Sequence, residues 1–245
     1  MRRKILAMLA LTAALLTAYS SGRGEEERPQ TEKNLAKPMR IGVIGAGSLG
    51  GTVGSVLVKA GHEVKFSSRH PDELAAMARE LGPRASVGTP REAAEFGTVL
   101  LFAVPYDALP ELGRDLKDAI RGKIVLDACN SWNNTAIEKE AVANGNGPTS
   151  AKLLGGTRLV RAFSAVDATQ IKASFQRQND KLGVPLASDD ADAMQVAAQL
   201  VRDAGCEPVI VGNRVEGRKF DKGSPGFRAN TTAEKLRRLL QLPTK

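Results

Sequence analysis

Residues 40–50 limit the fold of this chain more than any other segment. They read Arg-Ile-Gly-Val-Ile-Gly-Ala-Gly-Ser-Leu-Gly, a short apolar run that leads directly into the turn pattern G-x-G-x-x-G. Apolar residues at helical spacing follow within 53–58. A strand, a glycine turn and a helix in this order form the first unit of a parallel sheet covered by helices, and this context gives the glycine pattern its meaning. We therefore expect an α/β chain of the Rossmann type.

Each glycine of this turn has a separate physical role. Gly45 allows the tight turn, Gly47 lets the backbone approach a pyrophosphate, and Gly50 lets the helix pack close to the strand. The start of the helix also offers unpaired N–H groups and the positive end of the helix dipole. The pattern predicts a dinucleotide site whose binding residues are Gly45, Gly47, Ser48, Leu49 and Gly50.

The end of the second strand indicates which dinucleotide binds. A turn and a short strand over 61–66 are followed by Ser67, Ser68 and Arg69, with no carboxylate among them. An NAD site usually has Asp or Glu here, about 20 residues after the glycines, to accept from the ribose 2′-hydroxyl. A guanidinium instead offers a positive charge and a planar set of donors to a 2′-phosphate, and the hydroxyls of Ser67 and Ser68 can add shorter-range donors to it. We expect NADP(H) rather than NAD(H); the alternative is that Arg69 is an ordinary solvated loop residue.

Strand and helix patterns alternate through the rest of the chain. Further strands are expected at 98–104, 123–127, 158–163, 183–187 and 207–211. Helices are expected from Asp107 towards Ile120, from a cap at Asp189 or Asp190 through Val201, and within 232–242. This order predicts an α/β fold with a doubly wound, mostly parallel sheet, namely a Rossmann-type NAD(P)-binding fold with a small C-terminal extension.

Three segments that follow predicted strands should meet at one edge of this sheet, because ligands of such folds bind at the carboxyl ends of the strands. The segments are 103–106, 130–132 and 163–164, and the residues predicted to line a substrate pocket are Tyr106, Asn130, Trp132, Phe163 and Ser164. The alternative is that Trp132 and Phe163 are ordinary core aromatics and that Asn130 is a turn residue.

Five of these segments also carry a family resemblance. Taken in order, 41–51, 67–69, 103–106, 127–130 and 160–164 resemble the NADP oxidoreductases that work with coenzyme F420, a deazaflavin. The resemblance covers about residues 40–225. Many families share the glycine pattern, so the later segments are the ones that distinguish this family from the others.

The resemblance implies hydride transfer between NADP(H) and a small-molecule electron acceptor, with coenzyme F420 or a flavin as co-substrate. It places the pyrophosphate at Gly45, Gly47 and Gly50, and the 2′-phosphate at Ser68 and Arg69. Further cofactor-binding residues at the nicotinamide side are Ala103, Val104 and Pro105. No catalytic side chain is predicted, because in such reactions the cofactors carry the chemistry and the protein orients them.

Other functions are compatible with parts of the pattern. The main alternative is an exported nucleotide-binding protein without turnover. Pyrroline-carboxylate reductases and β-hydroxyacid dehydrogenases begin with a similar half, but they continue into a long helical domain, whereas this chain keeps alternating strand and helix. The acceptor, the direction of hydride transfer and the oligomeric state, including a homodimer, are left open.

Composition limits the range of partners. The 245 residues carry a formal charge of +8, to which Arg2, Arg3 and Lys4 contribute from the N-terminal segment. The basic residues are scattered and aromatic residues amount to 4%, so the sequence has neither a basic stripe nor a stacking platform for bases. We expect no nucleic-acid partner.

The first 39 residues differ in character from the rest. Three basic residues, an apolar run to Ala18 and small residues at 18–20 are typical of a signal peptide, and a polar stretch without apolar periodicity follows. The predicted division is a signal peptide at 1–20, a flexible linker at 21–39 and an NADP-binding oxidoreductase domain at 40–245. The protein would be exported or periplasmic, with no membrane span in the mature chain; a misassigned start would leave it cytoplasmic.

The cysteines and histidines point to no metal site. Cys129 and Cys206 occur without C-x-x-C or zinc-ligand spacing. They could pair in an oxidising compartment or be small buried core residues. His62 and His70 are expected on the solvated surface.

Overall fold

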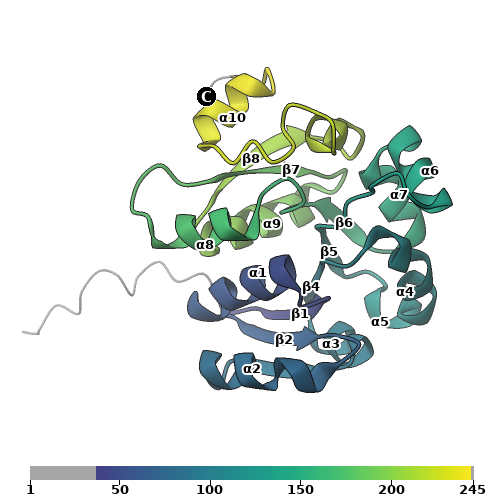
Figure 1. Ribbon diagram of the computed structural model, residues 1–245, viewed down its shortest axis with the longest axis vertical. Coiled ribbons are helices and arrows are strands. Elements are labelled where there is room, and N and C mark those ends of the chain that lie inside the picture. The colour runs from purple at the N-terminus through teal and green to yellow at the C-terminus, as the bar shows by residue number, and fades with distance from the viewer. Residues whose placement is uncertain (1–36, 244–245) are drawn as a thin grey trace, which may run out of the picture. The chain divides into compact units, whose positions relative to one another are not determined.

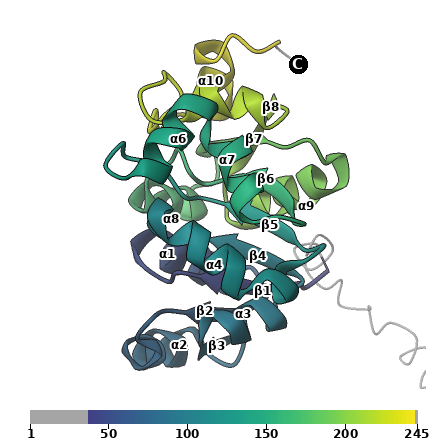
Figure 2. The same cartoon turned by 90° about the vertical axis from the view of Figure 1, so that its right-hand side faces the viewer.

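In the computed structural model, which describes residues 37–243, eight strands lie side by side in one sheet. Their order is β3-β2-β1-β4-β5-β6-β7-β8 (Figure 1, with β3 labelled in Figure 2). The strands are β1 (Arg40–Ile44), β2 (Glu63–Ser67), β3 (Ala85–Gly88), β4 (Val99–Phe102), β5 (Ile124–Asp127), β6 (Arg158–Arg161), β7 (Gly183–Ala187) and β8 (Glu207–Gly212). The first six strands are parallel, and β7 joins β6 in the antiparallel sense through the single pair Arg161 and Ala187. The predicted α/β, mostly parallel Rossmann-type fold is confirmed.

Helices cover both faces of the sheet (Figure 2). The α-helices are α1 (Ser48–Lys59), α2 (Ala75–Leu81), α3 (Pro90–Phe96), α4 (Leu109–Asp115), α5 (Lys117–Ile120), α6 (Ala136–Asn144), α7 (Asn146–Leu153), α8 (Ala168–Gln176), α9 (Ala191–Asp203) and α10 (Ala233–Leu239). Three short 3-10 turns accompany them, namely η2 (Pro71–Leu74), η3 (Tyr106–Ala108) and η4 (Val215–Phe220). The apolar faces of α1, α8 and α9 pack in one core layer, and those of α3, α4 and α5 pack in the other. A third cluster joins β7 and β8 to η4 and α10, which form the C-terminal extension.

Strand β1 lies in the middle of the first half of the sheet and contributes side chains to both core layers. Ile41 and Val43 pack in the layer of α1, whereas Ile44 packs in the layer of α3. Gly42 also faces α3, and a Cβ atom at this residue would lie 2.1 Å from the carbonyl oxygen of Ala93. The close approach of α3 to β1 therefore depends on the absence of a side chain at Gly42.

Two local features differ from the sequence prediction. Strand β3 was not expected; it leads into Thr89, whose side chain and that of Glu92 form a reciprocal capping box at the start of α3. The helix expected from Asp107 towards Ile120 is divided into η3, α4 and α5. Pro110 has no N–H group and its ring excludes a preceding helical turn, so it lies in the first turn of a new helix, α4.

His62 is not on the solvated surface as expected. Its side chain is buried, its Nδ1 accepts from the backbone N–H of Met39 at 3.1 Å, and its Nε2 lies 3.0 Å from a carboxylate oxygen of Asp203. This ring therefore ties the start of β1 to the end of α9. His70 is exposed, as expected.

The two cysteines are free and buried in different core layers, so no disulfide joins them. Burial raises the pKa of the Cys206 thiol to about 11 and also raises the pKa of Cys129, which keeps both in the neutral form.

The signal peptide predicted at 1–20 and most of the linker predicted at 21–39 lie outside the described residues, so the domain division and the export of the chain stay predictions. Between residues 37 and 243, no helix has both the length and the apolar character needed to cross a membrane.

The substitution Gly42→Ala is expected to destabilise the fold, because the added methyl group must push α3 away from β1. Overpacking of this kind typically lowers the free energy of unfolding by about 1–3 kcal/mol. Urea denaturation followed by circular dichroism measures the change. Gly47→Ala is the matched control, since a Cβ at Gly47 meets nothing within 4 Å; an equal loss in the two variants would contradict the packing argument.

Candidate functional site

The carboxyl ends of five strands form one row across the sheet. Ile44 is in register with Ser67 on one side and with Phe102 on the other. Phe102 pairs with Asp127, and Asp127 pairs with Arg161. The segments that follow these five residues therefore emerge side by side at the edge where ligands of this fold class bind.

A hollow of about 290 Å³ lies at this edge and is called the first hollow below. It is lined by Leu49, Ala103, Val104, Pro105, Tyr106, Ala128, Asn130, Trp132 and Glu138. Four of these belong to the predicted cofactor-binding set and three to the predicted substrate pocket. The structure therefore brings part of each set together in one place, in line with the topology argument.

The glycine turn has the geometry that phosphate binding needs. Gly45 has a φ of +93°, and a Cβ there would lie 2.6 Å from the carbonyl oxygen of Ala103. A Cβ at Gly50 would lie 2.2 Å from the carbonyl oxygen of Gly45, so α1 packs directly on the turn. Gly47 faces open space, and no side chain caps the first N–H groups of α1, which begins at Ser48. These N–H groups are available to an anion.

The end of β2 presents two of its three predicted residues. Arg69 is exposed and Ser68 is half-buried, with its Oγ accepting from the backbone N–H of His70 at 3.1 Å. Ser67 is different, because it is fully buried and its Oγ donates to the carbonyl oxygen of Val43 at 2.7 Å. The prediction that the Ser67 hydroxyl is a phosphate donor is therefore corrected: this hydroxyl joins β2 to β1.

Phe163 and Ser164 do not line the first hollow. Phe163 has a φ of +59°, and its ring is fully buried in the core layer of α1. Ser164 is also buried, and its carbonyl oxygen accepts from Nδ2 of Asn130 at 2.7 Å. The alternative weighed from the sequence, a core aromatic, is correct for Phe163. Ser164 acts through its backbone by orienting the Asn130 amide.

A fully buried guanidinium lies directly behind this edge. Nη1 of Arg161 donates to a carboxylate oxygen of Asp127 at 2.9 Å and to the carbonyl oxygen of Cys129 at 2.5 Å. Its Nη2 donates to Asp221 at 3.1 Å and to Asn130 Oδ1 at 3.2 Å. Burial alone would lower the pKa of Arg161, but the carboxylates of Asp127 and Asp221 outweigh it and raise this pKa. The charge is therefore permanent.

The same network continues to the wall of the first hollow. The second oxygen of Asp221 accepts from the backbone N–H of Asn146 at 3.1 Å, and the carbonyl oxygen of Asn146 accepts from the Tyr106 hydroxyl at 3.1 Å. The Tyr106 oxygen in turn accepts from Ser150 at 3.1 Å. Burial and the nearby charge of Asp127 raise the pKa of Tyr106, so its hydroxyl stays protonated and has a structural role.

Sequence reasoning did not assign roles to Asp127, Arg161 and Asp221. A signal was present for Asp127, which ends an otherwise apolar strand, because buried charges are almost always paired. The signal was weaker for Arg161, since its strand also begins with an arginine, Arg158. The identity of the third partner had no local signal, since Asp221 lies 60 residues after Arg161 in the chain.

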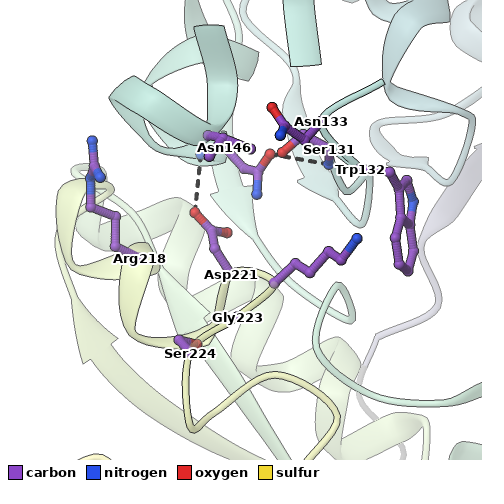
Figure 3. Close-up of a pocket in the computed structure, with 10 residues that line it drawn as sticks. Ser131, Trp132, Asn133, Asn146, Arg218, Asp221, Gly223 and Ser224 are labelled. Carbon is purple, nitrogen blue, oxygen red and sulfur yellow. Dashed lines mark hydrogen bonds between the residues drawn. The ribbon is translucent and has the colours of Figure 1, made fainter. Parts of the chain in front are cut away.

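A second hollow of about 490 Å³ adjoins the first through Trp132, which lines both. Figure 3 shows Trp132 on one side of the second hollow and Arg218 on the other, with Asn146 and Asp221 between them. The rest of its lining is Ser131, Asn133, Val142, Lys222, Gly223 and Ser224. The Trp132 side chain is 44% exposed. It is therefore a wall between two hollows and not a core aromatic.

Within the part of the chain that the structure describes, no group of three or more His, Cys, Asp or Glu side chains could hold a metal ion. The fold, the glycine turn and the first hollow together define a nucleotide-binding site of the Rossmann class.

Comparison with known proteins indicates which family of nucleotide-binding proteins this chain resembles. The model of the family described as "NADP oxidoreductase coenzyme F420-dependent" matches residues 40–131. The F420-dependent NADP reductase of Methanothermobacter marburgensis is 28% identical over 214 residues, which cover 76% of this chain and 90% of that protein. Metalloreductase STEAP3 of the rat is 25% identical over 182 residues, but the chain spans only 36% of its length.

Among solved structures, a hypothetical protein from Sinorhizobium meliloti has the same fold, with a TM-score of 0.69 and 22% identity over 81% of this chain and 97% of that one. The resemblance stated from the sequence is confirmed. Residues 40–131 match the model of the coenzyme F420-dependent NADP oxidoreductases, and the similarity to these relatives supports an NADP-dependent oxidoreductase.

Replacing Arg161 by Met is expected to destabilise the protein strongly, because it leaves the carboxylates of Asp127 and Asp221 buried without their partner. Breaking a buried ion pair in this way typically lowers the free energy of unfolding by about 3–5 kcal/mol. Denaturant titration measures the loss. Arg158→Met is the matched control on the same strand, since Arg158 pairs with Asp190 in a partly exposed position, and a much smaller loss is expected there. Similar losses in the two variants would contradict the assignment.

Proposed function

We propose that this protein transfers hydride between NADPH and a deazaflavin or flavin-like acceptor whose ring lies in the first hollow. The observation that carries the proposal is the composition of that hollow. Its lining joins the end of β4, at Ala103, Val104 and Pro105, to Tyr106, Asn130 and Trp132. A nicotinamide beside the first group and a planar acceptor beside the second would thus share one space.

The residues present fit NADP(H). The open space at Gly47 and the uncapped start of α1 suit a pyrophosphate, and exposed Arg69 at the end of β2 suits a 2′-phosphate. When bound, NADPH supplies the hydride. The role of Leu49, Val104 and Pro105 is to exclude water and restrict the orientation of a ring, and in hydride transfer correct placement supplies a large part of the rate enhancement.

The hollow holds no group suited to acid–base catalysis near neutral pH, in agreement with a hydride-transfer reaction. Tyr106 stays protonated because burial raises its pKa. For Glu138, burial raises the pKa, but backbone N–H groups at Asn134 and Thr135 donate to its carboxylate and lower it further than burial raises it. Neither side chain exchanges a proton under working conditions, so these residues contribute orientation, and the proton that accompanies the hydride into the reduced acceptor comes from solvent.

Anaerobic oxidation of NADPH tests this function directly. Purified protein is expected to oxidise NADPH with oxidised coenzyme F420 as acceptor and to do so more slowly with FMN, followed by the absorbance of the nicotinamide and of the acceptor. Binding of NADPH without turnover on any deazaflavin or flavin would contradict the proposal and would favour a nucleotide-binding protein without turnover.

Arg69→Glu is expected to lower the affinity for NADPH far more than that for NADH, because it places a like charge where the 2′-phosphate should lie. Loss of a charge-assisted contact of about 1.5–3 kcal/mol corresponds to a roughly 10- to 150-fold weaker binding of NADPH. Calorimetric titration with both nucleotides measures the difference. Arg84→Glu, an exposed arginine before the start of β3, should leave both affinities unchanged. Equal weakening for NADPH and NADH in Arg69→Glu would exclude a 2′-phosphate site at Arg69.

A further inference from the structure

The second hollow carries net positive charge, although one of its cations, Arg218, already donates to the carbonyl oxygen of Ala143. Two cationic side chains, Arg218 and Lys222, line it together with one carboxylate, Asp221. That carboxylate is already paired, because one oxygen accepts from buried Arg161 and the other from the backbone N–H of Asn146 (Figure 3). The field of the lining is therefore positive, with amide groups of Asn133 beside it as further donors.

Of these two cations, Lys222 is the one that contacts a residue of the first hollow, Trp132. Its ammonium lies 4.3 Å from the centre of the Trp132 ring, and Phe227 supports the ring from its edge at a centroid distance of 6.2 Å. The neighbouring carboxylates have other partners: Asp221 pairs with Arg161, and Glu138 accepts from two backbone N–H groups. In the described part of the chain, Lys222 is therefore held by a ring and not by an ion pair.

The position of this charge separates it from the nucleotide. The glycine turn follows β1 and the predicted 2′-phosphate site follows β2, whereas the second hollow lies beyond β5, two strands from β1 on the opposite side from β2. The phosphates of a dinucleotide bound at the glycine turn are thus accounted for elsewhere. An anion in the second hollow must belong to the other substrate.

We propose that the second hollow binds the anionic side chain of the electron acceptor, with Lys222 as the residue that selects for that charge. The acceptor ring lies in the first hollow on one side of Trp132, and its phosphate or carboxylate groups lie near Lys222 on the other. This inference rests on the proposed function and extends it: the acceptor class is a deazaflavin or flavin with a negatively charged side chain, and uncharged forms of the same ring are poor substrates.

The experiment compares two acceptors with the same ring. Coenzyme F420 has an anionic side chain, and 8-hydroxy-5-deazariboflavin has an uncharged one. Trp132 is the only tryptophan of the chain, so quenching of its fluorescence reports binding at the wall between the hollows. Wild-type protein saturated with NADP⁺ is expected to bind F420 at least about tenfold more tightly than the uncharged ring, a difference that added salt reduces.

Lys222→Met should remove most of this preference by weakening F420 binding about tenfold, with the uncharged ring and NADPH affected little. Lys222→Arg keeps the charge and should keep the preference. Lys219→Met is the matched control, because Lys219 pairs with Glu216 and does not line the hollow. An unchanged preference in Lys222→Met, or equal affinities for the two rings in the wild-type protein, would overturn the inference.

The outcomes also separate the inference from the function on which it rests. Binding and reduction of both rings with no charge preference would leave the proposed function standing and overturn the anionic subsite alone. Failure of both rings to bind, or of both to accept hydride from NADPH, would overturn the inference and the proposed function together.

Discussion

The buried charge of Arg161 is the constraint on which the ligand edge of this protein depends. A guanidinium without solvent is tolerated only when carboxylates and carbonyl groups surround it, and here Asp127, Asp221, Asn130 and the carbonyl of Cys129 do so. These partners come from the end of β5, from the segment directly after β5 and from the segment after η4, while Arg161 itself ends β6. One ion therefore holds three chain segments together, and the walls of both hollows are built on them.

The part of the sheet around β1 and the glycine turn depends on a different constraint. Glycines there have no side chain, and this allows helices to pack closely against the strand and the turn. Gly42 lets α3 approach β1, and Gly50 lets α1 pack on the turn at Gly45. Both contacts bring helices against a strand whose two faces are buried, so the carboxyl end of β1 becomes a rigid platform. The first hollow lies where the closely packed end of β1 meets the chain segments that Arg161 joins, so one part of its lining is held by packing and the other by ion pairs.

The fold and much of the first hollow could be predicted because their signals are local. These signals are a strand followed by G-x-G-x-x-G, the alternation of strands and helices, and the common edge at which parallel strands end. They were enough to predict that Val104, Asn130 and Trp132 lie at one site. Side-chain direction could not be predicted in the same way. Helices cover both faces of this sheet, so the strands read as continuous apolar runs. The pattern therefore did not show that the side chains of Ser67 and Phe163 both point inward.

The sequence by itself determined the order of elements and the type of nucleotide turn, because each is encoded by residues within a few positions of one another. Only the tertiary structure decided which charges meet. Asp221 reaches Arg161 across 60 residues of sequence, and His62 reaches Asp203 across 141. It also decided that Trp132 separates two hollows and that Lys222 lies over its ring. Such contacts follow from how the strands and loops are arranged in space. The spacing of residues along the sequence does not predict that arrangement.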